Sequence, residues 1–368
     1  MRIVVTGGGT GGHLYPGLAI ARALVRADPR VQPFFVGARR GIERDVLPTT
    51  EFPHLLLDLH PLYRSAPWKN WLTVRGALGA WSTLGRLFRE ERPAAVIGTG
   101  GYAAGLALAY GVTHGVPTML NEADSHPGLT TRLFARWARE VFLGFPEGAR
   151  LLKPGRRTRV EAFGNPIEPP PAVRPDRPAA RAAWGFPANG LVLLAVGGSQ
   201  GAKAINDTLA AWVRRGLPDG VHLLWATGKN QYEPYAALDG ASGDRVRVRP
   251  YLSPIAEAYA AADLALTRAG AMTIAELCAW GIPSVLVPLP TAAADHQTHN
   301  ARAMANAGAA VHVPQSELTP ERLDAVVGEL RSESARGALA ARAAERGRPD
   351  AAARIAARVL ESVAGAPI

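Results

Sequence analysis

The sequence predicts an α/β protein of two doubly wound, Rossmann-like domains that face each other across a cleft. Three observations predict this class. Short apolar runs alternate with helical patterns, which is typical of parallel sheets with crossover helices. At 368 residues, the chain exceeds what one hydrophobic core usually supports. A proline-rich segment, residues 164–178, divides the runs into two series that each begin with a glycine-rich turn.

The apolar runs set the expected domain boundaries. The first series is RIVVT, QPFFV, AAVIG, PTML and EVFLG, and the second is LVLLAV, VHLLWA, RVRV, DLALT, PSVLVP and AAVHV. The prolines of GNPIEPPPAVRPDRP cannot join either sheet, so this segment is expected to be a linker. We therefore expect an N-terminal domain over 1–163, a linker over 164–178 and a C-terminal domain over 179–340. Residues 341–368 are expected to form a helix that packs back toward the N-terminal domain.

The first glycine turn, in VVTGGGTGGHLYPG, joins a strand to a helix N-terminus, where backbone N–H groups and the helix dipole attract anions. Gly7, Gly9 and Gly12 satisfy the dinucleotide-binding pattern. The second strand, however, ends in Arg39 and Arg40, where an NAD-binding protein needs an acidic residue. This disfavours NAD and leaves an NADP-dependent dehydrogenase as a minor alternative that does not explain the second half of the chain.

Polar motifs in the second half predict a nucleotide-sugar site. GGSQGAKAIN resembles a P-loop but lacks the Lys-Ser/Thr pair of that motif, so a nucleoside triphosphatase is excluded. Ser199 and the backbone N–H groups of the glycine turn are still suited to binding a phosphate. Glu276 in TRAGAMTIAE can accept hydrogen bonds from a ribose diol. DHQTHN, residues 295–300, offers the donors and acceptors that a sugar needs. These features together favour a nucleotide-sugar glycosyltransferase of two Rossmann-like domains.

The composition of the chain indicates its class of partner and its cell compartment. The net charge of +10 indicates an anionic partner, which could be nucleic acid, an acidic membrane face or a phosphorylated substrate. The single cysteine, Cys278, cannot form an internal disulfide and fits a reducing cytoplasm. We expect no signal peptide and no membrane-spanning segment.

Ordered motifs along nearly the whole chain resemble the MurG family of peptidoglycan glycosyltransferases. They are GGGTGGHLYPGLAIA, VGARRGIE, LYR, GTGGYAAG, NEADSHPGLTTR, FGNPI, GGSQGAKAIN, TRAGAMTIAE and DHQTHN. The resemblance implies the GT-B architecture and an inverting transfer of N-acetylglucosamine from UDP-GlcNAc to the 4-hydroxyl of undecaprenyl-linked N-acetylmuramyl-pentapeptide, converting lipid I to lipid II. UDP-GlcNAc is then a substrate, and no cofactor is expected.

The resemblance also implies roles for individual residues. Ser199 contacts the phosphates, Leu252 and the backbone near Met272 frame the uracil, Glu276 binds the ribose, and Gln297 reads the sugar with Asn300 behind it. The full set of expected donor-site residues is Thr10, Gly11, Gly12, Asp124, Glu168, Ser199, Gln200, Leu252, Ala271, Met272, Thr273, Glu276, His296, Gln297 and Asn300.

On the acceptor side, the resemblance implies contacts from Tyr102 and Glu122. The transfer needs a base to take the proton of the attacking hydroxyl. His13 is the first candidate because its ordinary pKa lies near neutrality, although it could equally shape the turn by bonding the backbone. Glu122, in NEAD, is the second candidate. The chain departs from the family at Glu168, where an arginine is usual, and Lys203 or Arg268 could supply that charge.

Other functions on this architecture stay open. The chain could act on a different lipid or metabolite acceptor, epimerise a nucleotide sugar, or serve as a non-catalytic nucleotide-sugar-binding subunit. The resemblance excludes nucleic acid as a partner and leaves cell-wall synthesis proteins open as partners.

Residues 66–90 predict how the protein reaches a lipid-linked acceptor. On a helix, the apolar side chains of this segment form one stripe, which consists of Trp71, Val74, Leu78, Trp81 and Phe88. We expect this stripe to pack on a sheet. Leu72 falls off that stripe beside Arg75, and Trp68 lies just before the helix, a combination that suits a membrane interface. We therefore assign Trp68, Leu72, Arg75 and Trp81 to an anionic membrane surface on the cytoplasmic face.

The chain contains no Asp-x-Asp, the motif by which metal-dependent glycosyltransferases hold their cation. We therefore expect helix N-termini to stabilise the departing pyrophosphate, with no metal ion required. EDTA should leave the initial rate of transfer unchanged in a detergent assay that follows UDP release. Complete loss of activity, restored by added Mg²⁺, would contradict this account.

Overall fold

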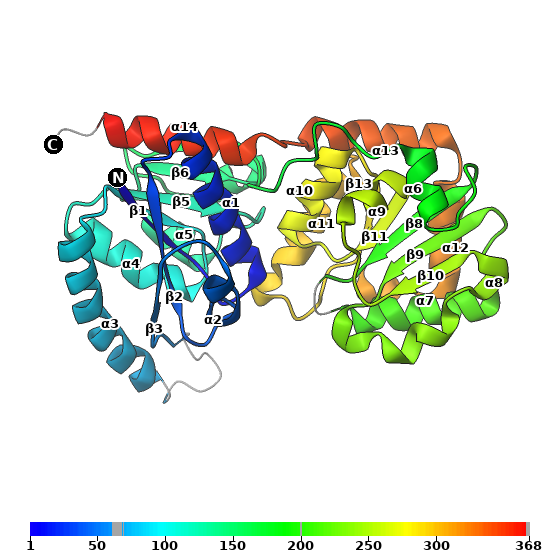
Figure 1. The fold of residues 1–368 in the computed structure, drawn as a ribbon, viewed down its shortest axis with the longest axis horizontal. Helices are drawn as coiled ribbons and strands as arrows, with labels where there is room; N and C mark the ends of the chain where they lie inside the picture. The colour runs from blue at the N-terminus through cyan, green and yellow to red at the C-terminus, as the bar shows by residue number, and fades with distance from the viewer. Residues whose placement is uncertain (61–67, 69, 199–200, 366–368) are drawn as a thin grey trace. The chain divides into compact units, whose positions relative to one another are not determined.

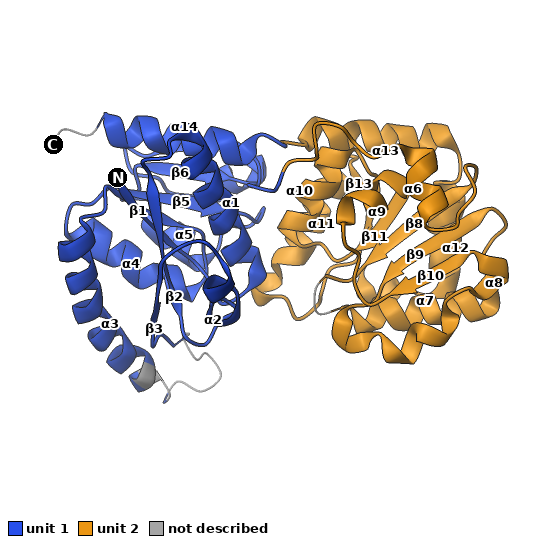
Figure 2. Ribbon diagram, viewed as in Figure 1, with its two compact units in different colours: residues 1–168, 349–368 blue, residues 169–348 orange. Residues whose placement is uncertain are grey.

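The computed structural model describes residues 1–60, 68, 70–198 and 201–365 (Figure 1). The chain forms two compact units, shown in different colours in Figure 2. Unit 1 comprises residues 1–168 and 349–368, and unit 2 comprises residues 169–348. Each unit is built around one parallel sheet.

Unit 1 contains a seven-stranded sheet in the order β3-β2-β1-β4-β5-β6-β7. Its strands are β1 (Arg2–Thr6), β2 (Gln32–Ala38), β3 (His54–Leu57), β4 (Ala95–Gly98), β5 (Thr118–Glu122), β6 (Glu140–Leu143) and β7 (Arg159–Glu161). Its helices are α1 (Gly11–Ala27), α2 (Glu43–Val46), α3 (Asn70–Glu91), α4 (Tyr102–Thr113), α5 (Leu129–Phe134) and α14 (Ala351–Ala364). All neighbouring strands run parallel.

Unit 2 contains a six-stranded parallel sheet in the order β10-β9-β8-β11-β12-β13. Its strands are β8 (Leu191–Val196), β9 (Val221–Ala226), β10 (Val246–Arg249), β11 (Leu264–Thr267), β12 (Ser284–Leu286) and β13 (Ala310–His312). Its helices are α6 (Arg177–Ala183), α7 (Lys203–Arg215), α8 (Ala241–Asp244), α9 (Ile255–Ala261), α10 (Ala271–Trp280), α11 (His296–Asn306), α12 (Pro320–Glu329) and α13 (Glu333–Arg346). Both units are therefore doubly wound, as predicted.

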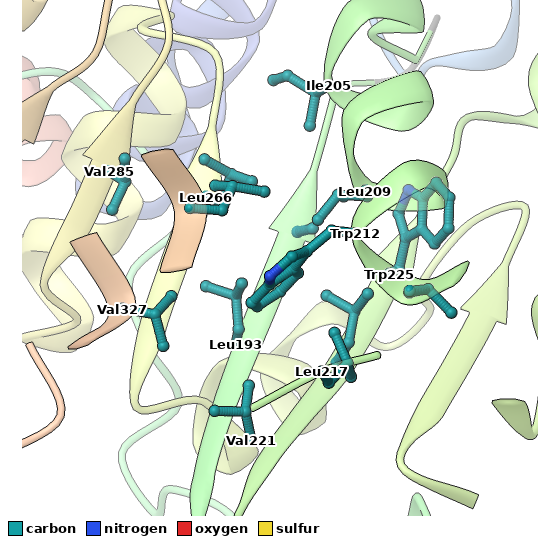
Figure 3. Close-up of a cluster of buried hydrophobic side chains, with 14 of the residues drawn as sticks. Leu193, Ile205, Leu209, Trp212, Leu217, Val221, Trp225, Leu266, Val285 and Val327 are labelled. Carbon is teal, nitrogen blue, oxygen red and sulfur yellow. The ribbon is translucent and has the colours of Figure 1, made fainter. Parts of the chain in front are cut away.

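Two buried tryptophans anchor the core of unit 2. Trp212 of α7 and Trp225 of β9 pack among aliphatic side chains such as Leu193 and Leu209 (Figure 3). Their indole N–H groups donate to Asp324 Oδ1 at 2.6 Å and to Asn206 Oδ1 at 2.9 Å. Because a buried indole N–H without a partner would be costly, these bonds let large rings fill the core.

The C-terminal helix α14 packs on α1 of unit 1 (Figure 1). Ile355 and Val359 join Ile20 and Leu24 in one buried cluster. The predicted end of the C-terminal domain, residue 340, is wrong because it falls inside α13. The units divide after residue 348 instead.

The predicted linker, 164–178, is anchored on both sides of the unit boundary. Asn165 donates to the Ala123 carbonyl at 3.0 Å within unit 1. Within unit 2, Arg174 donates to the Ala279 carbonyl at 3.0 Å, and α6 begins at Arg177. Residues 164–167 are therefore buried in unit 1, whereas residues 171–174 are exposed although Arg174 bonds unit 2.

All eleven predicted apolar runs contain strands, but β3 and β7 were not predicted. These two are the edge strands of the first sheet, with only four and three residues. An edge strand this short carries too little periodicity to stand out from a loop.

Candidate functional site

The glycine turn of unit 1 leaves the carboxyl end of β1 and enters α1. Gly9 has a φ of +88°, a conformation that favours glycine, and Thr10 is the N-cap of α1. Gly11 and Gly12 are the first residues of the helix, so their N–H groups belong to its unpaired first turn. The predicted residues Thr10, Gly11 and Gly12 are thus placed where an anion can be bound.

A fully buried carboxylate, Glu43 of α2, holds this turn from below. It accepts hydrogen bonds from Gly9 N at 2.9 Å and from Ala38 N at 2.9 Å. A Cβ atom at Gly8 would lie 2.2 Å from Glu43 Oε1, and one at Gly41 would lie 2.1 Å from Oε2. This role of Glu43 was not predicted, although the motif VGARRGIE contains both Glu43 and Gly41.

His13 lies between the two glycine turns of unit 1. Its Nδ1 is 3.2 Å from the Gly8 carbonyl oxygen and 3.3 Å from Thr10 Oγ1. A Cβ at Gly100 would lie 2.7 Å from His13 Cδ2, so the ring rests on the turn after β4. Because a carbonyl only accepts hydrogen bonds, the Gly8 contact requires the proton on Nδ1, and the neutral ring then carries its basic lone pair on Nε2.

Tyr102 follows the second glycine turn and is the first residue of α4. Its ring lies against Gly9, where a Cβ would be 3.1 Å from Tyr102 Cε1. The structure therefore brings Tyr102 and His13, both predicted site residues, to the same turn.

Glu122, at the end of β5, is 7% exposed and closes the following turn. Its Oε1 accepts from Asp124 N at 3.1 Å, and its Oε2 accepts from Gly128 N at 2.9 Å. Burial raises the pKa of Glu122 to about 7, against a lowering by hydrogen bonds that include one from Thr131. Both oxygens of the second candidate base are thus already engaged.

The donor-side predictions from Ser199 onward fall in unit 2, after β8, β10, β11 and β12. Ser199 and Gln200 lie outside the described residues. Of the two cations proposed to replace the family arginine, Lys203 pairs with Asp207 at 2.6 Å. Arg268 donates to Gln315 Oε1 at 2.8 Å and to the Pro288 carbonyl at 3.1 Å. Both side chains therefore already have partners within the protein.

Glu276 lies on α10, which Gly270 precedes as the N-cap. Its Oε2 accepts a hydrogen bond from the hydroxyl of Tyr259 at 2.7 Å. Ala271, Met272 and Thr273 form the first turn of the same helix. The structure therefore places four of the predicted donor residues on one helix.

Leu252 and Asn300 are less accessible than predicted. The Leu252 side chain is buried in the cluster that contains Tyr259 and Leu277, so only its backbone could frame a base. Asn300 is fully buried and donates to the Ala269 carbonyl at 3.2 Å. Its side chain therefore supports the turn before α10, which fits a place behind Gln297 and leaves no exposed surface for a direct contact.

His296 and Gln297 begin α11 after a strained turn. Ala294 and Asp295 have φ values of 53° and 54°, which residues other than glycine rarely adopt. His296 Nδ1 is 2.8 Å from the Ala293 carbonyl oxygen, and Gln297 Oε1 accepts from Leu289 N at 3.0 Å. These bonds fix the orientation of two predicted sugar-binding side chains.

Two acidic predictions remain in unit 1. Asp124 lies in the turn that Glu122 closes. Glu168 is exposed at the last residue of the first segment of unit 1. The pKa of Arg22 on α1 is raised by a hydrogen bond to Glu51 and, to a smaller extent, by the negative charge of Glu168.

The predicted membrane helix, α3, is buried only toward its C-terminal end. Leu84 and Phe88 are buried, and Trp81 packs against Tyr110 with ring centroids 4.9 Å apart. The Trp81 ring therefore packs, partly buried, against the core of unit 1, and the structure places it apart from the exposed end of α3.

The N-terminal half of α3 is exposed, contrary to the expectation that its stripe packs on a sheet. Trp71 is 57% exposed and Leu78 is 71% exposed, and Val74 and Arg75 are exposed as well. Trp68, just before the helix, is 71% exposed. The Leu72 side chain lies outside the described residues.

A second exposed apolar set was not predicted. Leu129 and Leu133 of α5 and the following Trp137 are exposed beside Arg132 and Arg136. The Arg136 guanidinium lies 4.7 Å from the centre of the Trp137 ring. Leu129, Leu133 and Trp137 recur at i, i+4 and i+8, the spacing of one helical face, so the sequence does carry a signal for this set.

Neither a metal site nor a membrane span is found in the described part of the chain. Among the described residues, no group of three or more His, Cys, Asp and Glu side chains is placed to hold a metal ion. No helix there combines the length and the hydrophobicity needed to cross a bilayer.

Comparisons with known proteins match both units. The chain matches the glycosyltransferase family 28 N-terminal domain over residues 3–143 and the C-terminal domain over residues 192–355. It is 42% identical to a Moorella thermoacetica protein over 99% of each chain, and that protein is named UDP-N-acetylglucosamine--N-acetylmuramyl-(pentapeptide) pyrophosphoryl-undecaprenol N-acetylglucosamine transferase. A Chlorobaculum parvum protein of the same name is 38% identical, over 98% of this chain and 99% of its own.

A solved structure agrees with these relatives. The crystal structure of Acinetobacter baumannii MurG matches with a TM-score of 0.77 and 28% identity, covering 98% of this chain and 99% of that one. The two parallel α/β units and their glycine turns thus define a glycosyltransferase of the GT-B architecture. Within glycosyltransferase family 28, the chain belongs to the MurG family. The NADP-dependent dehydrogenase alternative is therefore wrong.

The raised pKa of Glu122 predicts a pH-dependent stability. A carboxyl whose pKa rises from 4.5 to about 7 on folding stabilises the folded state fully below pH 4.5, and this contribution is lost as pH rises to about 7. The loss amounts to about 3 kcal/mol. Glu122→Gln should remove this dependence. In urea unfolding, the free energy of unfolding of the variant should therefore rise relative to that of the wild type as pH rises. Parallel stability curves for the two proteins would contradict the assignment.

Proposed function

We propose that this chain transfers N-acetylglucosamine from UDP-GlcNAc to the 4-hydroxyl of lipid-linked N-acetylmuramyl-pentapeptide. One observation carries the proposal: the match to a transferase named for this reaction spans 99% of both chains, so both units are included. UDP-GlcNAc enters as a substrate, and no cofactor is expected. The functions left open by the sequence, including epimerisation and a purely binding role, gain no support from a specific contact in the structure.

The reaction is an inverting displacement. The acceptor oxygen forms a bond to the anomeric carbon as the bond from that carbon to the phosphate oxygen breaks, and UDP leaves with the electron pair. The acceptor hydroxyl gives up its proton to a base. His13 fits this role because its Nδ1 contact with the Gly8 carbonyl leaves the lone pair of the neutral ring on Nε2.

The direct test offers purified protein with UDP-GlcNAc and lipid-linked muramyl-pentapeptide. Release of UDP together with formation of the lipid-linked disaccharide supports the proposal. Water and a simple polyprenyl phosphate serve as control acceptors. UDP release that does not depend on the muramyl acceptor would overturn it.

His13→Ala should lower kcat by about 10²–10⁴, the usual contribution of a general base, and leave the KM for UDP-GlcNAc unchanged. His13→Asn is the matched control because its amide can still donate to the Gly8 carbonyl but cannot accept the proton. Both variants should therefore be equally slow. Recovery of activity in His13→Asn, with a lower Tm in His13→Ala alone, would assign His13 to shaping the turn.

We also propose that the enzyme binds the cytoplasmic face of an anionic membrane peripherally, through the N-terminal half of α3. The exposed Trp68, Trp71 and Leu78 supply apolar contacts at headgroup depth, and Arg75 supplies charge. A cation near such a surface contributes about 1 kcal/mol and is screened by salt. At that face the enzyme would have access to both its UDP-sugar donor and its polyprenyl-linked acceptor.

Combined Trp71→Ala, Arg75→Glu and Leu78→Ser changes should weaken co-sedimentation with anionic vesicles at low salt. A matched control, Val173→Ser with Arg342→Glu, changes an exposed apolar residue and an exposed cation in unit 2 and should bind like the wild type. Equal binding by all three proteins would move the membrane contact away from α3, with α5 as the next surface to test.

A further inference from the structure

Tyr259 of α9 touches the carboxylate to which ribose binding is assigned. Its side chain is 6% exposed, and its hydroxyl donates to Glu276 Oε2 at 2.7 Å. Glu276 itself is only partly buried. Its Oε1 makes no hydrogen bond to a side chain or backbone group among the described residues. The carboxylate is therefore held by one oxygen and open at the other.

The hydroxyl of Tyr259 is not needed to fill space. The ring packs in the cluster that contains Leu252 and Leu277, and it meets Trp280 with ring centroids 5.6 Å apart. Phenylalanine would keep these contacts and lose only the hydrogen bond. A tyrosine at this buried position thus serves the carboxylate that it faces.

The bond also affects the charge of Glu276. Burial raises the pKa of Glu276, and the hydrogen bond from Tyr259 lowers it. Burial and the neighbouring Glu276 raise the pKa of Tyr259 itself, so the phenol keeps its proton and remains a donor. Tyr251 is the other titratable group that acts on Tyr259.

We propose that Tyr259 is a positioning residue for nucleotide recognition: it fixes Glu276 through Oε2 so that Oε1 meets the ribose diol of a uridine nucleotide. This inference rests on the proposed function, because it assigns the ribose contact to Glu276. It predicts that discrimination between ribose and 2′-deoxyribose depends on the Tyr259 hydroxyl, which itself touches no ligand.

The test compares binding of UDP and 2′-deoxy-UDP by calorimetry. A hydrogen bond to a charged group corresponds to a preference for UDP of about tenfold to 150-fold in the wild type. Tyr259→Phe should lose most of that preference. Tyr235→Phe is the matched control, because its hydroxyl also donates to a carboxylate, Asp207 Oδ1, at 2.7 Å. The control should keep the wild-type preference.

Two further readouts separate positioning from a structural role. UDP affinity of Tyr259→Phe should fall more steeply than that of the wild type as pH is lowered, because Glu276 protonates more readily without the hydrogen bond from Tyr259. In a background of Glu276→Ala, adding Tyr259→Phe should have no further effect on UDP binding. In the transfer assay, Tyr259→Phe should raise the donor KM and leave kcat unchanged.

A wild-type preference and pH profile in a folded Tyr259→Phe variant would overturn the proposal. It would also be overturned if Tyr259→Phe weakened UDP binding further in the Glu276→Ala background. A Tyr259→Phe variant that merely unfolds would give this same result. If the wild type distinguishes UDP from 2′-deoxy-UDP through Tyr259 but transfers no sugar to the lipid-linked acceptor, the proposed function fails while the positioning role stands.

Discussion

The parallel direction of every strand pair is the constraint on which both candidate sites depend. It brings the carboxyl ends of all strands to one edge of each sheet. In unit 1 the strand order reverses between β1 and β4, and in unit 2 it reverses between β8 and β11. Such reversal points are where open α/β sheets bind ligands. The two glycine turns around His13 leave β1 and β4, and the helix that carries Glu276 follows β11.

Side chains from other segments can pack directly against the backbone of these turns because the turns contain glycine, which has no Cβ atom. The His13 ring occupies the space that a Cβ at Gly100 would fill, and the Glu43 carboxylate does the same at Gly8. Glu43 is buried and bonds backbone N–H groups of two segments. An anion buried in this way is tolerated only when hydrogen bonds replace water, so the turn and the carboxylate depend on each other.

The sequence predicted what local patterns specify. Apolar runs located the strands of both sheets, and the glycine turns located the helix N-termini that follow them. Contacts between distant segments left no such pattern. Glu43 is an ordinary acidic residue on a short helix until β1 and β2 bring Gly9 and Ala38 to it. Likewise, the burial of Asn300 and the exposure of Trp71 depend on what packs opposite them, which periodicity alone does not specify.

The two carboxylates of the sites show how environment divides roles between identical side chains. Burial raises the pKa of both Glu122 and Glu276. Glu122 bonds backbone N–H groups through both oxygens, so its hydrogen-bonding capacity is taken up in closing a turn. Glu276 accepts a hydrogen bond from Tyr259 through Oε2, and among the described residues its Oε1 has no hydrogen-bond partner. A base must offer a lone pair to the acceptor hydroxyl. Because both oxygens of Glu122 bond the backbone, we favour the imidazole of His13, whose basic nitrogen is Nε2, as the proton acceptor.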